Sequence, residues 1–171
     1  MAIEIKDYDP AWPTRFAEQR DRLAEVLAPW LAAPIEHIGS TSVPGLRAKP
    51  IVDILAPVDS LAARAAMVEV LSADGWLYWP DDPNRAERLW FLRPKPEART
   101  HHLQVVEYDS SKARAVLAFR DALRADSALA REYEDLKVRL AREYPEDRNA
   151  YTDAKANFVA RVVKGTEPPA I

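Results

Sequence analysis

Residues Ile35 to Val58 read IEHIGSTSVPGLRAKPIVDILAPV and hold the most informative residues of the chain. An apolar run at 35–38 leads into a turn of small and hydroxyl-bearing residues that starts at Gly39, and a second apolar run follows at 51–55. Short apolar runs bounded by turn residues are typical of strands. The stretch therefore predicts a strand, a turn, a loop and a second strand.

Asp53 interrupts the second apolar run. Because side chains alternate across a strand, Ile51, Asp53 and Leu55 share one face while the other face is wholly apolar, which predicts a central strand. An unpaired carboxylate in such a strand costs several kcal/mol. We therefore expect Asp53 to meet a cation, a set of hydrogen-bond donors or a metal. Pairing with Lys49 or Arg47 is the purely structural alternative.

The turn Gly39-Ser40-Thr41-Ser42 has a composition that suits an anion. Glycine lets the backbone approach a ligand closely, and Ser40 can cap a short helix whose first N–H groups attract anions. Together, the turn and Asp53 would offer donors to phosphate oxygens and a carboxylate to a cation. A turn that only caps a helix is the alternative.

The motif HIGSTSVPGL at 37–46, followed by Asp53, closely resembles the signature of the GrpB family. These are small bacterial proteins whose fold is similar to the nucleotidyltransferase domain of the polymerase beta superfamily. In that superfamily a Gly-Ser turn precedes a strand that carries an acid, an apolar residue and a second acid. Gly39-Ser40 and Asp53 match this pattern, and Leu55 stands where the second acid is expected.

Composition predicts one domain without membrane association. At 171 residues the chain is long enough for a single core, which we expect over 1–165, with a frayed tail at 166–171. A formal net charge of -3 argues against general nucleic-acid binding. The chain has no cysteine, and we expect neither a signal peptide nor a membrane helix, which predicts a cytoplasmic location.

Hydrophobic periodicity predicts the order of the elements. We expect helices over 11–31, 60–73, 110–125, 127–144 and 147–164, and strands over 3–5, 35–38, 51–55, 76–79, 88–93 and 100–107. This order predicts an α+β domain with a small mixed β-sheet, helices packed mainly on one side and a C-terminal helical segment. The resemblance implies that this domain is nucleotidyltransferase-like.

The strand expected at 100–107 places His102 and Gln104 on one face. Members of the family that this chain resembles often carry His-Leu-His here, on the strand beside that of Asp53, so Gln104 replaces a histidine. The superfamily's third catalytic acid generally comes from this strand as well, but Glu107 would point to the opposite face. His102 as the general base of a different transfer or hydrolytic reaction is a further hypothesis.

Three long cations lie on otherwise apolar helical stripes, namely Arg20, Arg120 and Lys155. Such side chains can bury their stems and keep their charged heads in water. The resemblance favours a shared polar site for Arg120 and Lys155, with Arg20 as a further candidate. We expect that site where the Gly39 turn meets Asp53 and the His102 strand.

The resemblance implies nucleotidyl transfer to a small molecule or a protein group, with a nucleoside triphosphate as substrate. Asp53 would bind Mg²⁺, and Lys49 and His102 are the other catalytic candidates. The cofactor-binding candidates are the turn residues Gly39, Ser40 and Thr41, together with Gln104, Arg120 and Lys155.

The second hypothesis is a non-catalytic module that binds a nucleotide or another anion, or that assists a protein partner. Domains that resemble this chain occur fused to dephospho-coenzyme A kinases, which is consistent with an assisting role. Under this hypothesis we expect an anion bound without a metal, contacted by Ser40, Lys49 and Lys155.

Overall fold

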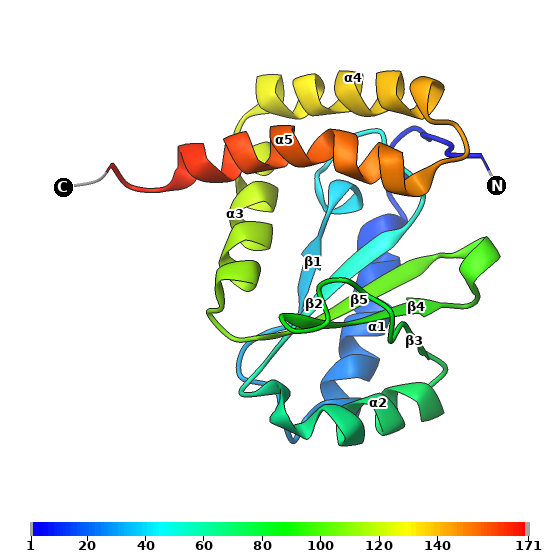
Figure 1. The fold of residues 1–171 in the computed structure, drawn as a ribbon, viewed down its shortest axis with the longest axis vertical. Helices are drawn as coiled ribbons and strands as arrows, with labels where there is room; N and C mark the ends of the chain where they lie inside the picture. The colour runs from blue at the N-terminus through cyan, green and yellow to red at the C-terminus, as the bar shows by residue number, and fades with distance from the viewer. Residues whose placement is uncertain (1, 170–171) are drawn as a thin grey trace.

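The structure, a computed structural model, describes residues 2–169 (Figure 1). Its helices are α1 (Trp12–Val26), α2 (Arg64–Ala73), α3 (Ser111–Ala125), α4 (Ser127–Glu143) and α5 (Arg148–Thr166). Its strands are β1 (Glu36–Ile38), β2 (Val52–Val58), β3 (Leu77–Tyr78), β4 (Arg88–Arg93) and β5 (His101–Glu107). Three short 3-10 turns, η1 (Ser40–Ser42), η2 (Leu61–Ala63) and η3 (Pro96–Ala98), lie between them.

The five strands form one mixed sheet in the order β1-β2-β5-β4-β3. Strands β2 and β5 pair in parallel, and every other neighbouring pair is antiparallel. The strand that carries Asp53 is therefore flanked on both sides, as its apolar faces predict. The predicted α+β class with a small mixed sheet is confirmed.

The two faces of the sheet are covered differently (Figure 1). Helices α1 and α2 pack on the face that carries Ile54 and Leu103, and this is the larger hydrophobic core, with Leu23 and Met67 fully buried. Helix α3 packs on the other face near β1, where Leu55 is buried against it. Much of the face that carries Asp53 is therefore left to polar side chains.

Helices α4 and α5 lie side by side and extend beyond the sheet from α3 (Figure 1). The three helices join through a small aromatic core in which Tyr133 and Phe158 stack with ring centroids 5.2 Å apart and Phe119 meets both edge-on. This core holds α5 above the polar part of the sheet. Lys155 is thereby carried towards Asp53.

Each C-terminal helix begins at a residue that caps it. The side chains of Ser110, Asp126 and Asp147 each accept a hydrogen bond from a backbone N–H in the first turn of α3, α4 and α5. A cap of this kind is typically worth about 1 kcal/mol. These caps explain why sequence alone predicts the three helix starts to within one or two residues.

Several boundaries differ from prediction; for example, β2 extends to Val58, and the helix expected at 60–73 starts as the 3-10 turn η2. The strand expected at 3–5 does not form: Lys6 makes an isolated bridge with Ala48, and Ile3 donates its N–H to the carbonyl of Pro145. Its alternating isoleucines pack beside α4 and α5 instead of extending the sheet. The helix expected at 11–31 ends at Val26, because the chain turns before its bridge to β2. In the expected tail, α5 continues to residue 166, and 170–171 lie outside the described residues.

Within residues 2–169, every helix is too short or too polar to span a membrane.

Candidate functional site

Asp53 and His102 lie side by side in the middle of the sheet. They are register partners on the parallel strands β2 and β5, and Nδ1 of His102 lies 3.1 Å from Oδ1 of Asp53. The Asp53 side chain keeps 29% of its surface exposed and that of His102 keeps 15%. Strand pairing therefore turns the acid and the histidine into one polar pair that is open to solvent on one side.

The Gly39 turn touches this pair. Gly39 has φ 72° and ψ -173°, a backbone conformation that is essentially restricted to glycine. A Cβ added at this position would lie 2.5 Å from Oδ2 of Asp53, which is closer than real Cβ contacts come. Glycine is thus required at this position for two reasons: the backbone conformation disfavours other residues, and the carboxylate of Asp53 leaves no room for a side chain. The expected meeting of the turn with Asp53 is present.

Thr41 is buried and its hydroxyl group is used inside the protein. It donates its one proton to the carbonyl of Ile51 at 3.1 Å, so Nε2 of His37, which lies 3.0 Å away, must donate to it. Burial lowers the pKa of His37 to about 4, which keeps the ring neutral. The side chain of Thr41, a predicted ligand, is therefore placed in a structural hydrogen-bond chain.

Ser40 sits at the edge of the same turn and is half-buried. It hydrogen-bonds the phenol of Tyr133 on α4; burial raises the pKa of that phenol to about 12, and the Ser40 contact opposes this rise. The amides of Ser42 and Val43 bond within the turn, to Gly39 and Ser40. The amides of Ser40 and Thr41 remain as the turn's candidate donors to an anion.

Lys49 and Lys155 lie against one aromatic ring. Their Nζ atoms are 4.8 Å and 4.4 Å from the centroid of Tyr151, which is fully buried. Burial lowers the pKa of Lys49, and burial and Lys49 lower the pKa of Lys155 to about 8. The charge of Asp53 acts the other way on both. Two ammonium groups thus crowd one another beside a single carboxylate.

Further cations surround this pair. Arg148, at the start of α5, and Arg99, after η3, both act on Lys49 as nearby positive charges. Lys137 is buried, donates to the carbonyl of Arg47 at 2.5 Å, and has its pKa lowered to about 7 by burial and by Lys155. The protein therefore gathers several positive charges here, where Asp53 is the carboxylate that acts on Lys49 and Lys155 and Glu134 is the one that acts on Lys137.

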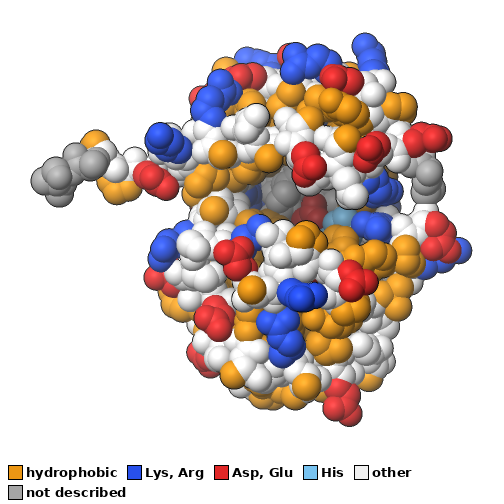
Figure 2. Space-filling view, in the orientation of Figure 1, with side chains coloured by type: hydrophobic (Ala, Val, Ile, Leu, Met, Phe, Trp, Pro, Cys, Tyr) orange, Lys and Arg blue, Asp and Glu red, His pale blue; other side chains and the backbone are white. Residues whose placement is uncertain are grey.

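Figure 2 shows the surface on this side of the molecule hollowed between the helical layer and the sheet, with acidic, histidine and basic side chains inside the hollow. We use the name polar hollow for the group of Lys49, Asp53, His102, Arg148 and Lys155, which the contacts and charge interactions described above bring together. A low-dielectric wall on both sides strengthens the field of charges in such a recess.

Two predicted cations lie elsewhere. Arg120 donates to Glu36 at 2.6 Å and to the carbonyl of His37 at 3.1 Å, and its Nε donates to Asp121 at 2.9 Å, so it fastens α3 to β1. Arg20 is exposed on α1, which covers the opposite face of the sheet. The predicted shared site therefore contains Lys155 but not these two guanidinium groups.

The side chains of the polar hollow do not fit a pair of magnesium ions held by the protein. Mg²⁺ prefers oxygen ligands, and the two-metal arrangement needs carboxylates that bridge the ions. Asp53 offers one carboxylate, and Leu55, at the position of the second acid, is fully buried. In the part of the chain that the structure describes, no three His, Cys, Asp or Glu side chains are grouped to hold a metal.

Comparison with known proteins decides the family. The family model described as GrpB protein matches residues 2–165. The chain belongs to the GrpB family. A UPF0157 protein of Pseudomonas aeruginosa is 42% identical over 165 residues, which are 94% of this chain and 66% of that relative. Because the chain spans just under two thirds of this relative, the activity of the whole relative is not transferred to it.

A solved GrpB structure has the same fold. The crystal structure of conserved protein GrpB from Enterococcus faecalis superposes with a TM-score of 0.85 at 32% identity, covering 95% of this chain and 96% of the other. A dephospho-CoA kinase of Mycolicibacterium paratuberculosis is 35% identical over 101 residues, which are 57% of this chain but 23% of the kinase. The resemblance to the GrpB family expected from the Gly39 motif is confirmed.

Sequence reasoning missed several residues of this GrpB site. Trp90 is the register partner of Gln104, and its ring centroid lies 4.8 Å from that of His102. Arg99 covers Trp90 from the loop after β4, with Cζ 5.5 Å from the ring centroid. Arg148 lies at the first turn of α5. Their positions depend on strand register and helix packing, and neither is visible in the local pattern.

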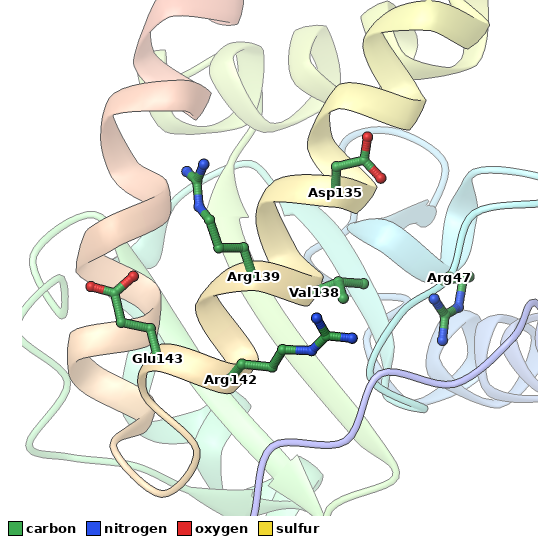
Figure 3. A pocket seen from close by; sticks show the side chains of 6 residues that line it. All are labelled: Arg47, Asp135, Val138, Arg139, Arg142 and Glu143. Carbon is green, nitrogen blue, oxygen red and sulfur yellow. The ribbon is translucent and has the colours of Figure 1, made fainter.

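A separate groove of about 450 Å³ lies on the outer side of α4 in the GrpB fold. It is lined by Arg47, Asp135, Val138, Arg139, Arg142 and Glu143. Figure 3 shows Arg47 and Arg142 extending towards each other across it. None of the residues of the polar hollow lines this groove, and its carboxylates offset part of its positive charge. We therefore place the candidate site in the polar hollow.

Proposed function

We propose that this protein binds a small molecule that bears two or more phosphate groups, in the polar hollow and without a metal held by the protein. The observation that carries the proposal is the charge of the hollow: Lys49 and Lys155 both lie close enough to Asp53 for its charge to act on them, and Arg99 and Arg148 add positive charge beside Lys49. Among residues 2–169, no carboxylate forms a salt bridge with any of these four cations.

The cost of this arrangement supports a ligand. Burial and like charges disfavour the protonated forms of Lys49 and Lys155, so the free protein holds their charges at a loss of stability. A polyanion would relieve that repulsion and raise both pKa values. Electrostatic crowding that destabilises the free protein but favours a bound anion is common at binding sites.

The Gly39 turn would contribute neutral donors. The amides of Ser40 and Thr41 directly follow Gly39, which packs against Asp53, and Ser40 remains partly exposed. Lysine contacts a phosphate as a point charge, whereas backbone N–H groups fix its orientation. Lys49 and Lys155 would thus supply most of the affinity, and the turn would position the terminal phosphate.

Calorimetric titration with pyrophosphate in the presence of EDTA tests the proposal. We expect saturable binding that is lost or weakened at least about tenfold in Lys155→Gln, as the loss of a charge-assisted contact requires. Lys164→Gln, on the same helix but at its exposed end, is the matched control and should bind as the unmodified protein does. Absence of pyrophosphate binding to a folded protein would refute the proposal.

A second candidate is nucleotidyl transfer. The close approach of the Gly39 turn to Asp53 favours it, because the superfamily that the GrpB signature resembles uses this turn and acid. The lone carboxylate counts against it, since the side chains do not fit two protein-held magnesium ions. Transfer of a labelled nucleotide that requires Mg²⁺ and is abolished in Asp53→Asn would establish it in place of simple binding.

The match to a dephospho-CoA kinase supports an accessory role. A segment of that kinase is related to this chain, so a related segment occurs in a protein that is named for handling a phosphate-bearing compound. Under our proposal the polar hollow would bind such a compound beside a catalytic partner. The same pyrophosphate titration tests the binding half of this role.

A further inference from the structure

His102, the partner of Asp53, carries a buried hydrogen-bond acceptor. Asp53, when ionised, can only accept, so Nδ1 of His102 must carry the proton that joins them at 3.1 Å. In the neutral ring Nε2 is then an acceptor. This atom is buried and has no hydrogen-bond partner within residues 2–169.

Gln104 adds a second acceptor beside it. The two residues are separated by one position on β5, so their side chains share the sheet face of Asp53. Oε1 of Gln104 is also buried, and no donor in the described part of the chain reaches it. Buried acceptors without donors are unfavourable, so two of them together point to a donor that comes from outside the chain.

A flat surface lies next to these acceptors. Trp90 is paired with Gln104 across the strands and its ring lies against that of His102. Arg99 lies beside two indole rings, with its Cζ 5.5 Å from the ring centroid of Trp90 and 5.7 Å from that of Trp79. Indole rings and guanidinium planes are the surfaces on which proteins stack heteroaromatic rings.

We propose that the ligand of the polar hollow carries an amino-substituted heteroaromatic ring in addition to its phosphates. Its amino N–H groups would donate to Nε2 of His102 and Oε1 of Gln104, its ring would stack on Trp90, and its phosphates would lie at Lys49 and Lys155. The inference rests on the proposed phosphate binding and specifies the chemistry of the part of the ligand that does not bear phosphate. A keto oxygen at the same position would face Nε2 of His102 and Oε1 of Gln104, and this would be unfavourable because all three atoms are hydrogen-bond acceptors.

Entry of the ring requires a side-chain movement. Both acceptor atoms are buried, Trp90 lies against His102, and Arg99 lies beside Trp90. Arg99 is held by one hydrogen bond of 3.0 Å, from its Nε to the carbonyl of Pro96. It can therefore move to the other side of a bound ring while its charge stays near the phosphates.

The test compares two pairs of triphosphates by calorimetry in EDTA, with pyrophosphate as the reference. ATP and purine riboside 5′-triphosphate differ by one amino group, and CTP and UTP exchange amino for keto. We expect the amino-bearing member of at least one pair to bind at least about tenfold more tightly, the scale of one buried hydrogen bond. Gln104→Met should lose this preference, and Arg139→Gln, on the outer groove, should keep it.

The outcomes separate the two proposals. Pyrophosphate binding with no amino preference in either pair, or with a preference for UTP, would overturn the ring assignment and leave phosphate binding intact. Failure of pyrophosphate and of all four triphosphates to bind would overturn both. Quenching of tryptophan fluorescence by the preferred triphosphate, lost in Trp90→Phe, would support stacking; equal quenching in that variant would contradict it.

Discussion

Oδ2 of Asp53 occupies the space where a Cβ of residue 39 would lie, at 2.5 Å. The turn and the acid, which are separated by a loop in the sequence, are therefore packed as one unit. This contact fixes the carboxylate beside His102 and faces it towards the cations of α5. A substitution of Gly39 should therefore displace the side chain of Asp53, and a substitution of Asp53 should alter the packing of the turn.

Gly39→Ala should destabilise the protein by about 3 kcal/mol or more, since it combines backbone strain with a clash against Asp53. Gly45→Ala is the matched control: its φ is 79°, but no atom lies within 4 Å of an added Cβ. The control should lose only about 1 to 2 kcal/mol from backbone strain. Urea unfolding of both variants measures the difference, and equal losses would show that the Asp53 contact does not constrain the turn.

Lys155→Met should stabilise the free protein by about 1 to 3 kcal/mol at pH 7 while it removes phosphate binding. The native pKa of Lys155 is lowered to about 8 from the ordinary value of 10.5, so the native state binds the proton less tightly than the unfolded state. The cost is fully present below pH 8 and is relieved between pH 8 and about 10.5. The stability gain of the variant should therefore shrink as pH rises through that window.

Urea unfolding at pH 7 and pH 9.5 measures this change. Lys164→Met, on the exposed end of α5, should leave stability within about 0.5 kcal/mol at both pH values. Destabilisation by Lys155→Met at pH 7 would mean that Lys155 is a structural residue of the helix and not a strained member of a binding site.

Thr41→Val should cost about 1 to 3 kcal/mol of stability without weakening pyrophosphate binding. It leaves the N–H of His37 and the carbonyl of Ile51 buried without their shared partner. Thr41→Ser keeps the hydroxyl group and should lose much less. Thermal unfolding checks the first claim and calorimetry the second. A loss of binding in Thr41→Val at full stability would restore Thr41 as a ligand.

Asp53→Asn separates anion binding from metal-dependent transfer. At pH 6.5 Lys155 is protonated, so removing the carboxylate removes a repulsion of the anion while this cation stays charged, and pyrophosphate should bind at least as tightly in EDTA. A site that uses Asp53 to recruit Mg²⁺ would instead lose binding in the variant when Mg²⁺ is present. Calorimetry with and without Mg²⁺ distinguishes these results.

The sequence predicts much of this fold because its signals are local. Alternation identifies β2 as a central strand around Asp53, and Ser110 and Asp147 mark helix starts through contacts a few residues away. The adjacency of His102 to Asp53 came from the family resemblance, because no local pattern specifies which strands pair. The strand expected at 3–5 failed for the same reason: its alternation reports burial but does not identify the partner.

The site is less predictable because long-range pairing decides which cations remain available. Arg120 and Lys155 are both cations on apolar helical stripes, so the sequence does not distinguish them. Glu36 forms a salt bridge with Arg120, whereas no carboxylate in residues 2–169 forms one with Lys155. Likewise Arg47, an alternative partner for Asp53, lies 3.1 Å from Asp7. Only the three-dimensional arrangement separates structural arginines from the cations of the hollow.

Proton uptake on binding of methyl diphosphate, a ligand whose phosphate groups are fully ionised at pH 8.5, tests the central claim most directly at that pH. A phosphate seated on Lys155 raises its pKa from about 8, so calorimetry in two buffers of different ionisation enthalpy should show protons taken up by the protein complex. Binding without any proton uptake in the unmodified protein would place the anion away from Lys155 and contradict the account.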